Sequence, residues 1–180
     1  MEKIITHEIT ITQSFGNITR QRYALLVLTD GQGHYILSGK PMYPVGTYRF
    51  FGGGVDQGET ALDGAQRELQ EETGITDAVF EPLLTITTKA TDAEGKKYTL
   101  ESAIFLVTIG NQPIQLGDDV TKIITTDVEG IKQAAENFQR MPHEKFFYPG
   151  SGDYYYLDDY GKLFGFIMER TYSVLRSRSV

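Results

Sequence analysis

The stretch RELQEETG, from Arg67 to Gly74, places Glu68, Glu71 and Glu72 within little more than one turn of a predicted helix. Acidic side chains three or four residues apart on a helix share a face and repel by about 0.2–0.5 kcal/mol per pair. Gly74 indicates the end of that helix, where the helix dipole disfavours an acid by about 0.3–1 kcal/mol. Local electrostatics therefore opposes this stretch, and a bound cation would offset the repulsion.

The sequence predicts where the helix that carries these acids begins and ends. Thr60 and Asp63 predict a capping box at its start, and Gly74 suits the left-handed position after its end, so we expect a helix over Thr60 to Thr73. Its apolar stripe comprises Leu62, Ala65 and Leu69. The acids form a second stripe roughly a quarter-turn away. One face is therefore expected to be buried and another to present carboxylates.

The residues around the helix strengthen the case for a metal site. The segment GGGVDQGE lets the backbone turn tightly and leaves its carbonyls accessible. Arg67 lies four residues from both Asp63 and Glu71, so it is expected to pair with both and to hold the acids in place. Hard oxygen ligands on a rigid helix favour Mg²⁺ or Mn²⁺. The alternative is an ordinary solvated face, since most charge runs on helices face water.

From Gly53 through Ile75 the chain reads GGVDQGETALDGAQRELQEETGI, which resembles the Nudix box. That motif is Gly, five residues, Glu, seven residues, then Arg-Glu-apolar-any-Glu-Glu-any-Gly-apolar, as in this chain. The matching positions are Gly53, Glu59, Arg67, Glu68, Leu69, Glu71, Glu72, Gly74 and Ile75. Because the fixed identities agree without a gap, the match is far more specific than a lone glycine pattern.

The resemblance implies an α/β fold, an α/β/α sandwich around a mixed β-sheet, with the box as a loop and helix. It also implies a hydrolase that uses Mg²⁺ or Mn²⁺ to cleave the diphosphate linkage of a nucleoside diphosphate joined to another group. The implied metal ligands are Glu68, Glu71, Glu72 and the backbone carbonyl of Gly52 or Gly53. Glu68, Arg67 and Glu71 are the implied catalytic residues, and Glu59 helps to organise the box. An anionic diphosphate does need cations to neutralise its charge and activate water.

The base that deprotonates the attacking water differs between branches of this family. Glu68 in the box is one candidate, and acids from later segments are others. These are Glu101 in TLESAIF and Asp118 and Asp119 in QLGDDVTK. Gly-Asp-Asp is also common turn chemistry, so the aspartates have a structural alternative. The candidates for substrate contact are Arg49 and Phe51, just ahead of the glycines, and the same three later acids.

The chain departs from the family pattern at positions that bear on the substrate. Phe51 stands where many members carry proline, and Gly64 where alanine is commoner, at a cost of about 1 kcal/mol of helix stability. Many ADP-ribose hydrolases carry a proline downstream of the box, and the dinucleoside polyphosphate branch a tyrosine near there. This chain has Thr91, Asp92 and Ala93 in that region. ADP-ribose or a nucleotide sugar is favoured over triphosphates, but neither marker is present.

Composition sets further expectations. The chain has 180 residues, 40% of them hydrophobic and 23% charged, which suits one globular domain over residues 1–180. Its net charge of −7 disfavours a nucleic-acid polymer as partner, because such binding needs a concentrated basic face. The lack of cysteine excludes disulfides and a cysteine nucleophile. Without a signal-peptide pattern or a membrane-spanning apolar run, we expect a cytoplasmic protein that binds no membrane.

Periodicity predicts the elements outside the box. Expected strands are Ile4 to Gln13, Tyr23 to Thr29, His34 to Ser38, Pro82 to Lys89 and Tyr98 to Ile109. Further helices are expected at about Val128 to Arg140 and about Asp159 to Arg176. The segments TDGQG and TDAEGKK predict two hairpin turns. Strands and helices mixed in this way favour a layered α/β or α+β sandwich.

The C-terminal part, about residues 146–176, includes the unusually aromatic segment YPGSGDYYYLDDYGKLFGF. Such tyrosines more often fill a core or a subunit interface than stack on a nucleobase, and the interface alternative predicts a homodimer. His7, His34 and His143 are widely separated, without metal-ligand spacing, and are expected to be structural.

Three functions follow from these observations. The sequence favours a metal-dependent hydrolase of a nucleoside diphosphate derivative. The second function is a Nudix-fold module that binds or senses a nucleotide metabolite without catalysis, although such members commonly lose box acids and here all are present. The third, isopentenyl-diphosphate isomerase, relies on a cysteine, which this chain lacks.

Overall fold

The computed structural model describes residues 3–117, 120–148 and 152–178, and within them one mixed sheet of seven strands forms the centre of the fold. Six strands follow the order β1-β5-β6-β2-β3-β7, and β4 pairs with β2. The strands of this sheet are β1 (Lys3–Thr10), β2 (Arg22–Thr29), β3 (Tyr35–Gly39), β4 (Phe51–Gly54), β5 (Val79–Thr91), β6 (Lys97–Thr108) and β7 (Lys122–Thr126). Pairing is parallel between β1 and β5 and between β2 and β6, and antiparallel elsewhere.

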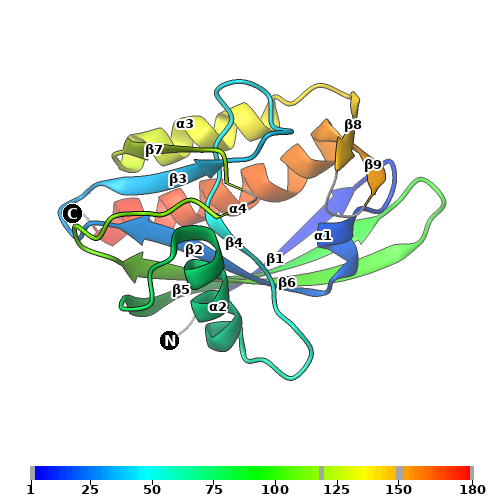
Figure 1. Cartoon of the computed structure of the whole chain (residues 1–180). Helices are drawn as coiled ribbons and strands as arrows, with labels where there is room; N and C mark the ends of the chain where they lie inside the picture. The colour runs from blue at the N-terminus through cyan, green and yellow to red at the C-terminus, as the bar shows by residue number, and fades with distance from the viewer. Residues whose placement is uncertain (1–2, 118–119, 149–151, 179–180) are drawn as a thin grey trace.

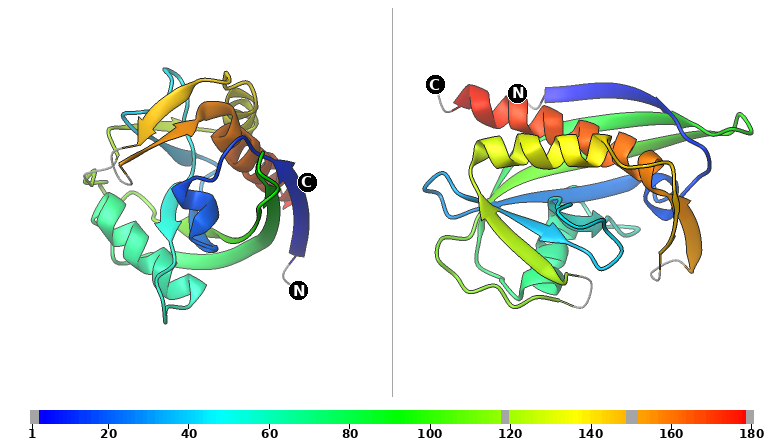
Figure 2. Two further views of the ribbon diagram at one scale, coloured as in Figure 1. Left: turned by 90° about the vertical axis from the view of Figure 1, so that its right-hand side faces the viewer. Right: turned by 90° about the horizontal axis from the view of Figure 1, so that it is seen from above.

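Helices cover both faces of this sheet (Figures 1 and 2). One face carries α2 (Ala61–Thr73), and the other carries α3 (Val128–Gln139) and α4 (Leu157–Arg178). Each helix layer has its own hydrophobic cluster, centred on Leu69 on the α2 side and on Phe138 and Phe164 on the other side. The predicted α/β/α sandwich around a mixed sheet is confirmed.

The borders of α2 agree with the sequence. The Thr60 hydroxyl accepts a hydrogen bond from Asp63 N (3.1 Å), and Asp63 Oδ2 accepts one from Thr60 N (2.9 Å), which completes the capping box. Gly74 ends the helix in the left-handed conformation, with φ 71°. Two side chains differ from the predicted stripes: Leu62 is 41% exposed, whereas Glu72 is only 7% exposed.

Strand β4 is Phe51 followed by three glycines, and the sequence analysis did not identify it as a strand. Its antiparallel register places Gly52 opposite Leu25 and Gly53 opposite Ala24 of β2. Gly52 has φ 106°, and a Cβ there would lie 2.2 Å from the Ala24 carbonyl oxygen. Only glycine fits this position, because a side chain would meet both the strained conformation and the neighbouring backbone. The close approach brings β4 directly beside α2.

The other predicted elements are confirmed with shifted borders. The hairpin of β5 and β6 is longer than predicted, and α4 begins at Leu157. Besides β4, the sequence missed one short helix and three short strands: α1 (Gly16–Thr19), β7, β8 (Lys145–Tyr148) and β9 (Asp153–Tyr156). The last two form a separate hairpin that leads into α4.

The aromatic C-terminal segment divides between core and surface. Tyr155 and Tyr160 are 2% and 1% exposed, whereas Tyr154 is 58% exposed. The Tyr160 ring packs against Phe15 and Phe164, with ring centroids 5.6 and 4.7 Å away. Core packing therefore accounts for part of the segment. Among the described residues, no helix has the length and hydropathy needed to cross a bilayer.

Candidate active site

Arg67 is the centre of the box. Its guanidinium binds both carboxylate oxygens of Glu59, through Nε at 2.9 Å and Nη2 at 3.1 Å. Nη1 donates to Glu68 Oε1 (2.9 Å) and Glu71 Oε2 (3.1 Å), and Nη2 also donates to the Gly54 carbonyl (2.7 Å). The planar guanidinium of Arg67 therefore bonds to three acids and to β4, and it fixes the positions of these acids relative to β4.

Glu59 is held as an anion. The hydrogen bonds from Arg67, assisted by the Asp56 backbone N–H at 2.8 Å, lower the pKa of Glu59 to about 2. The expected pairing of Arg67 with Asp63 is replaced by this pair, since the Asp63 carboxylate caps the helix through Thr60. Glu59 lies outside α2, so its pair with Arg67 attaches the preceding loop to the helix.

Glu68 is the more deeply placed of the two acids that share Nη1 of Arg67. Its side chain is 13% exposed, against 57% for Glu71. Burial raises the pKa of Glu68, the Arg67 hydrogen bond opposes that shift, and the negative charge of Glu72 adds to it. A Cβ on Gly53 would lie 2.6 Å from Glu68 Oε1. The glycine therefore lets the backbone of β4 approach the carboxylate.

Glu72 is bonded to β4 rather than to Arg67. Its Oε2 accepts a hydrogen bond of 2.6 Å from the Gly52 backbone N–H, and its Oε1 lies 3.6 Å from Lys40 Nζ. Both side chains of this ion pair are buried. The structure thus brings Glu68 and Glu71 together and holds Glu72 separately by an amide and a lysine.

Arg49 lies on the other side of Gly52. Its Nη2 donates to the Gly52 carbonyl (3.2 Å), and its guanidinium stacks 4.5 Å from the centre of the Phe164 ring of α4. The side chain is 3% exposed, and its Nε and Nη1 have no hydrogen-bond partner among the described residues. Arg49 therefore links α4 to the glycine strand, and Gly52 links that strand to Glu72.

The described residues suit a divalent cation. Within residues 3–117, 120–148 and 152–178, no three His, Asp or Glu side chains already converge on one point. Nη1 of Arg67 nevertheless donates to one oxygen of Glu68 and one oxygen of Glu71. These two carboxylates therefore already hold one positively charged group between them. Carboxylate oxygens beside an open backbone are the donor set that Mg²⁺ and Mn²⁺ prefer. The donor set fits such an ion, and the lack of a side chain at Gly53 lets the Glu68 carboxylate lie against the backbone of β4.

The remaining candidates lie in different places. Phe51 is fully buried in the cluster beneath α2, and Arg49 is also buried, which argues against direct substrate contact by either. Glu101 is exposed on β6, opposite Arg22 in the parallel register. Asp118 and Asp119 lie outside the described residues.

Three basic residues near the box were missed by the sequence analysis. Lys40 neutralises Glu72, and Arg22 Nη1 donates to the Glu59 carbonyl (3.0 Å). A Cβ on Gly54 would lie 2.7 Å from Arg20 Nη1, so that guanidinium rests against β4. Strand alternation did not indicate the two arginines, because the chain is not extended between them: Gln21 has φ 68°, and Arg22 N bonds to the Arg20 carbonyl. Lys40 carries no local signal.

The geometry agrees with a family match. The chain matches the family model described as NUDIX domain over residues 19–146. The chain belongs to the Nudix family. The match runs from just before β2 into β8 and therefore includes the whole Nudix box and every strand of the seven-stranded sheet except β1. It confirms the resemblance inferred from the box and supports the prediction that the chain is a pyrophosphohydrolase.

Solved structures share the Nudix fold at low identity. A MutT protein from Bacillus halodurans is 24% identical, with a TM-score of 0.53, over 63% of this chain and 72% of that one. The Ap4A hydrolase of C. elegans is 19% identical, with a TM-score of 0.50, over 87% and 97%. A MutT/Nudix family protein from Enterococcus faecalis is 23% identical, with a TM-score of 0.47, over 59% of this chain and 43% of its own length. The likenesses to the Bacillus halodurans and C. elegans proteins support the fold.

Proposed function

We propose that this Nudix protein is a divalent-metal-dependent hydrolase that cleaves the diphosphate linkage of a nucleoside diphosphate derivative, with ADP-ribose or a nucleotide sugar as the favoured substrate. The observation that carries the proposal is the placement of Glu68 and Glu71 on one guanidinium, that of Arg67, beside the backbone of Gly53. A purely solvated acid face does not need such an arrangement.

Glu68, Glu71 and the Gly53 backbone are the groups that would hold Mg²⁺ or Mn²⁺. When bound, the ion would neutralise charge on the diphosphate and lower the pKa of a water molecule. Glu72 stays a third proposed ligand, because a carboxylate has lone pairs beyond the one used by the Gly52 N–H. The other oxygen, Oε1, lies 3.6 Å from Lys40 Nζ, so the buried carboxylate has a counter-charge.

Glu68 is the proposed general base. A base works best when its pKa approaches the working pH, and burial raises the pKa of Glu68 in that direction. Arg67 orients the carboxylate through Oε1, which leaves Oε2 to accept a proton from the attacking water. Glu59 and the Gly54 carbonyl hold Arg67 in turn, so the position of the base depends on the loop before α2.

The proposal is tested with a substrate panel. Purified protein is incubated with ADP-ribose, nucleotide sugars, dinucleoside polyphosphates and nucleoside triphosphates, in Mg²⁺, in Mn²⁺ and in EDTA, and products are separated by ion-exchange chromatography. We expect cleavage of at least one nucleoside diphosphate derivative and none in EDTA. Failure of every compound in both metals would overturn the proposal and favour a module that binds a nucleotide metabolite without catalysis.

A further inference from the structure

The loop that leads into α2, residues 55–59, is called the box loop below. It ends at Glu59, whose carboxylate binds Arg67, and Arg67 in turn binds Glu68. The three middle residues of the loop are exposed, so apolar packing does little to fix its conformation. Polar contacts at its two ends therefore determine where Glu59 lies.

Arg22, the first residue of β2, bonds to the main chain at both ends of the box loop. Its carbonyl accepts a hydrogen bond from Val55 N (3.1 Å), and its Nη1 donates to the Glu59 carbonyl (3.0 Å). Strand β2 pairs with β3, β4 and β6, and every residue of β2 after Arg22 is buried. Arg22 therefore attaches the loop to a rigid strand in the middle of the sheet.

Glu59 is the residue at which three sets of contacts meet. Within the loop, Glu59 N donates to the Asp56 carbonyl (3.1 Å), and Asp56 N donates to Glu59 Oε2 (2.8 Å). The carbonyl of Glu59 binds Arg22, and its carboxylate binds Arg67. A shift of the main chain at Glu59 would therefore move the carboxylate that holds Arg67.

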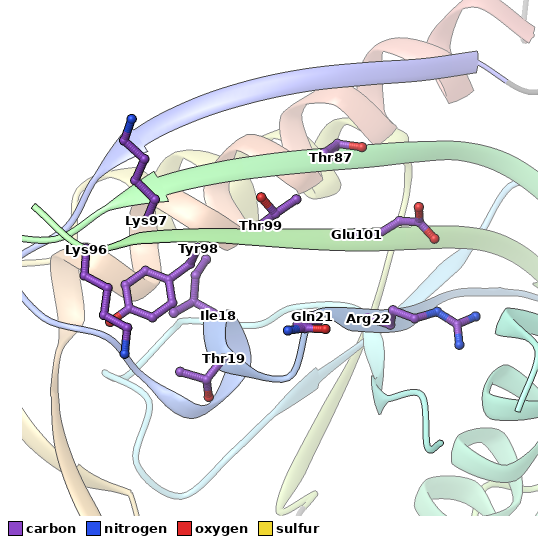
Figure 3. A pocket seen from close by; sticks show the side chains of 10 residues that line it. All are labelled: Ile18, Thr19, Gln21, Arg22, Thr87, Lys96, Lys97, Tyr98, Thr99 and Glu101. Atoms are coloured by element: carbon purple, nitrogen blue, oxygen red, sulfur yellow. The ribbon is translucent and has the colours of Figure 1, made fainter. Parts of the chain in front are cut away.

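A strained turn precedes Arg22, at one end of a groove of about 800 Å³ (Figure 3). Gln21 has φ 68°, the only positive φ of a residue other than glycine within the described ranges. Arg22 N donates to the Arg20 carbonyl at 2.9 Å, which closes a three-residue turn of a rare and costly kind. The Gln21 carbonyl accepts a hydrogen bond of 2.8 Å from Glu101 N, which fastens the turn to β6.

The direction of the Arg22 side chain agrees with a role at the box. Figure 3 shows it extending away from Lys96, which lies at the far end of the groove. Its charge also acts on Glu59: the hydrogen bonds from Arg67 lower the pKa of Glu59 most, and the positive charge of Arg22 adds to that effect. Arg22 therefore contacts Glu59 through a hydrogen bond and through its charge.

We propose that Arg22 is a positioning residue for the box, which sets the place of the Arg67 guanidinium through Glu59 and thereby orients Glu68. The inference rests on the proposed function, in which Glu68 is the general base. Arg22 acts through the main chain of Glu59. Its removal is therefore expected to lower kcat and to leave KM nearly unchanged.

The first measurement needs neither metal nor turnover. NMR spectra of the metal-free protein give the rate at which the Arg67 Nε–H, which donates to Glu59 Oε1 at 2.9 Å, exchanges with water. The signal is assigned by its loss in Arg67→Lys. We expect exchange at least about tenfold faster in Arg22→Met, which keeps a long side chain but cannot donate to the Glu59 carbonyl.

Two further variants are the controls for this measurement. Arg22→Lys should stay within about threefold of the wild-type exchange rate, because an ammonium group can still donate to the carbonyl. Arg140→Met removes an exposed arginine just after α3 and should leave the rate unchanged. Melting curves establish that each variant is folded at the temperature of the measurement.

Kinetics on the best substrate of the panel separates positioning from a general effect on stability. We expect kcat of Arg22→Met to fall about tenfold with KM within about twofold of wild type, and Arg22→Lys to recover most of the loss. In a Glu59→Ala background, Arg22→Met should lower kcat by less than about twofold, because the link from Glu59 to Arg67 is already broken.

The outcomes separate this proposal from the proposed hydrolase. Unchanged exchange of the Arg67 Nε–H in Arg22→Met overturns the positioning role, whatever happens to turnover. Faster exchange at wild-type kcat, or a loss of kcat that is equally large in the Glu59→Ala background, overturns it as well. If wild type cleaves no compound of the panel, the proposed hydrolase fails, and the exchange rate alone decides whether Arg22 positions Arg67.

Discussion

The backbone N–H of Gly52 donates a 2.6 Å hydrogen bond to Oε2 of Glu72, so the residue just before the box holds the last acid of the box. The same glycine accepts a hydrogen bond from Arg49 through its carbonyl. The two peptide groups on either side of the Gly52 Cα therefore connect a buried arginine, which stacks on α4, to a buried glutamate on α2. The close packing of β4 against β2 and α2 makes this connection, and it depends on glycine at position 52.

Replacing Gly52 tests this dependence. A Cβ in Gly52→Ala would lie 2.2 Å from the Ala24 carbonyl oxygen, in addition to the strain of φ 106°. Gly46→Ala is the control, since φ is 81° there and no atom lies within 4 Å. We expect urea unfolding to show a loss of about 1–2 kcal/mol for the control and at least about 2 kcal/mol more for Gly52→Ala. Equal losses would mean that the strand contact is unimportant.

A second prediction concerns Arg67. A lysine in its place keeps the positive charge but lacks the planar guanidinium with its several N–H donors. Arg67→Lys cannot bind Glu59 at two oxygens while reaching Glu68 and the Gly54 carbonyl. We expect kcat to fall about 10²-fold, since small displacements of catalytic groups have effects of that size. Arg140→Lys, at an exposed ion pair with Glu136, should leave kcat unchanged. A kcat for Arg67→Lys within threefold of wild type would remove Arg67 from its proposed role.

The pKa of Glu59 predicts a dependence of stability on pH. The folded protein lowers this pKa from 4.5 to about 2, so the stabilising effect is present above pH 4.5 and is lost as the pH falls toward 2. The melting temperature of wild type should therefore fall more steeply over that interval than that of Glu59→Gln. Parallel curves for the two proteins would show that the Arg67 pair does not lower the pKa of Glu59.

The C-terminal tyrosines provide a prediction about packing. Tyr160 is 1% exposed and Tyr154 is 58% exposed, although the sequence places both in one aromatic run. Tyr160→Ala should reduce the free energy of unfolding by about 3–5 kcal/mol, because it leaves a large cavity. Tyr154→Ala should change it by less than about 1 kcal/mol. A loss of affinity for nucleotide in Tyr154→Ala at unchanged stability would instead support base stacking.

Local chemistry explains which parts of the fold were predictable. The capping box of Thr60 and Asp63 and the left-handed Gly74 depend only on neighbours in sequence, and they set the borders of α2 correctly. Strand β4 was missed because glycines have weak strand propensity, and its pairing with β2 depends on backbone proximity that no side-chain pattern records. The predicted burial of Leu62 was wrong, since this side chain is 41% exposed whereas Ala65 and Leu69 are buried.

In the site, too, contacts between neighbours in sequence were easier to predict than long-range contacts. Arg67 and its acids belong to one helix and one preceding loop, and spacing correctly predicted the contact of Arg67 with Glu71. The predicted pair of Arg67 with Asp63 was wrong, because Glu59 takes that place.

The burial of Glu72 depends on Lys40 and Gly52, which reach it only through the pairing of strands. Neutralising an exposed Glu72 would raise stability, whereas neutralising a Glu72 that pairs with buried Lys40 is expected to lower stability, because it breaks a buried ion pair. Long-range contacts therefore reverse the sign of the stability change that helix spacing alone would predict for neutralising Glu72.

The most direct test of the central claim is the turnover number of Glu68→Gln at saturating Mg²⁺, measured on the best substrate of the panel. The variant keeps the size of the side chain and one hydrogen-bond acceptor for Arg67, but it loses the charge and the base. The account predicts a fall in kcat of at least about 10³-fold, with none for Glu136→Gln on α3. A Glu68→Gln enzyme that retains more than a tenth of wild-type kcat would contradict it.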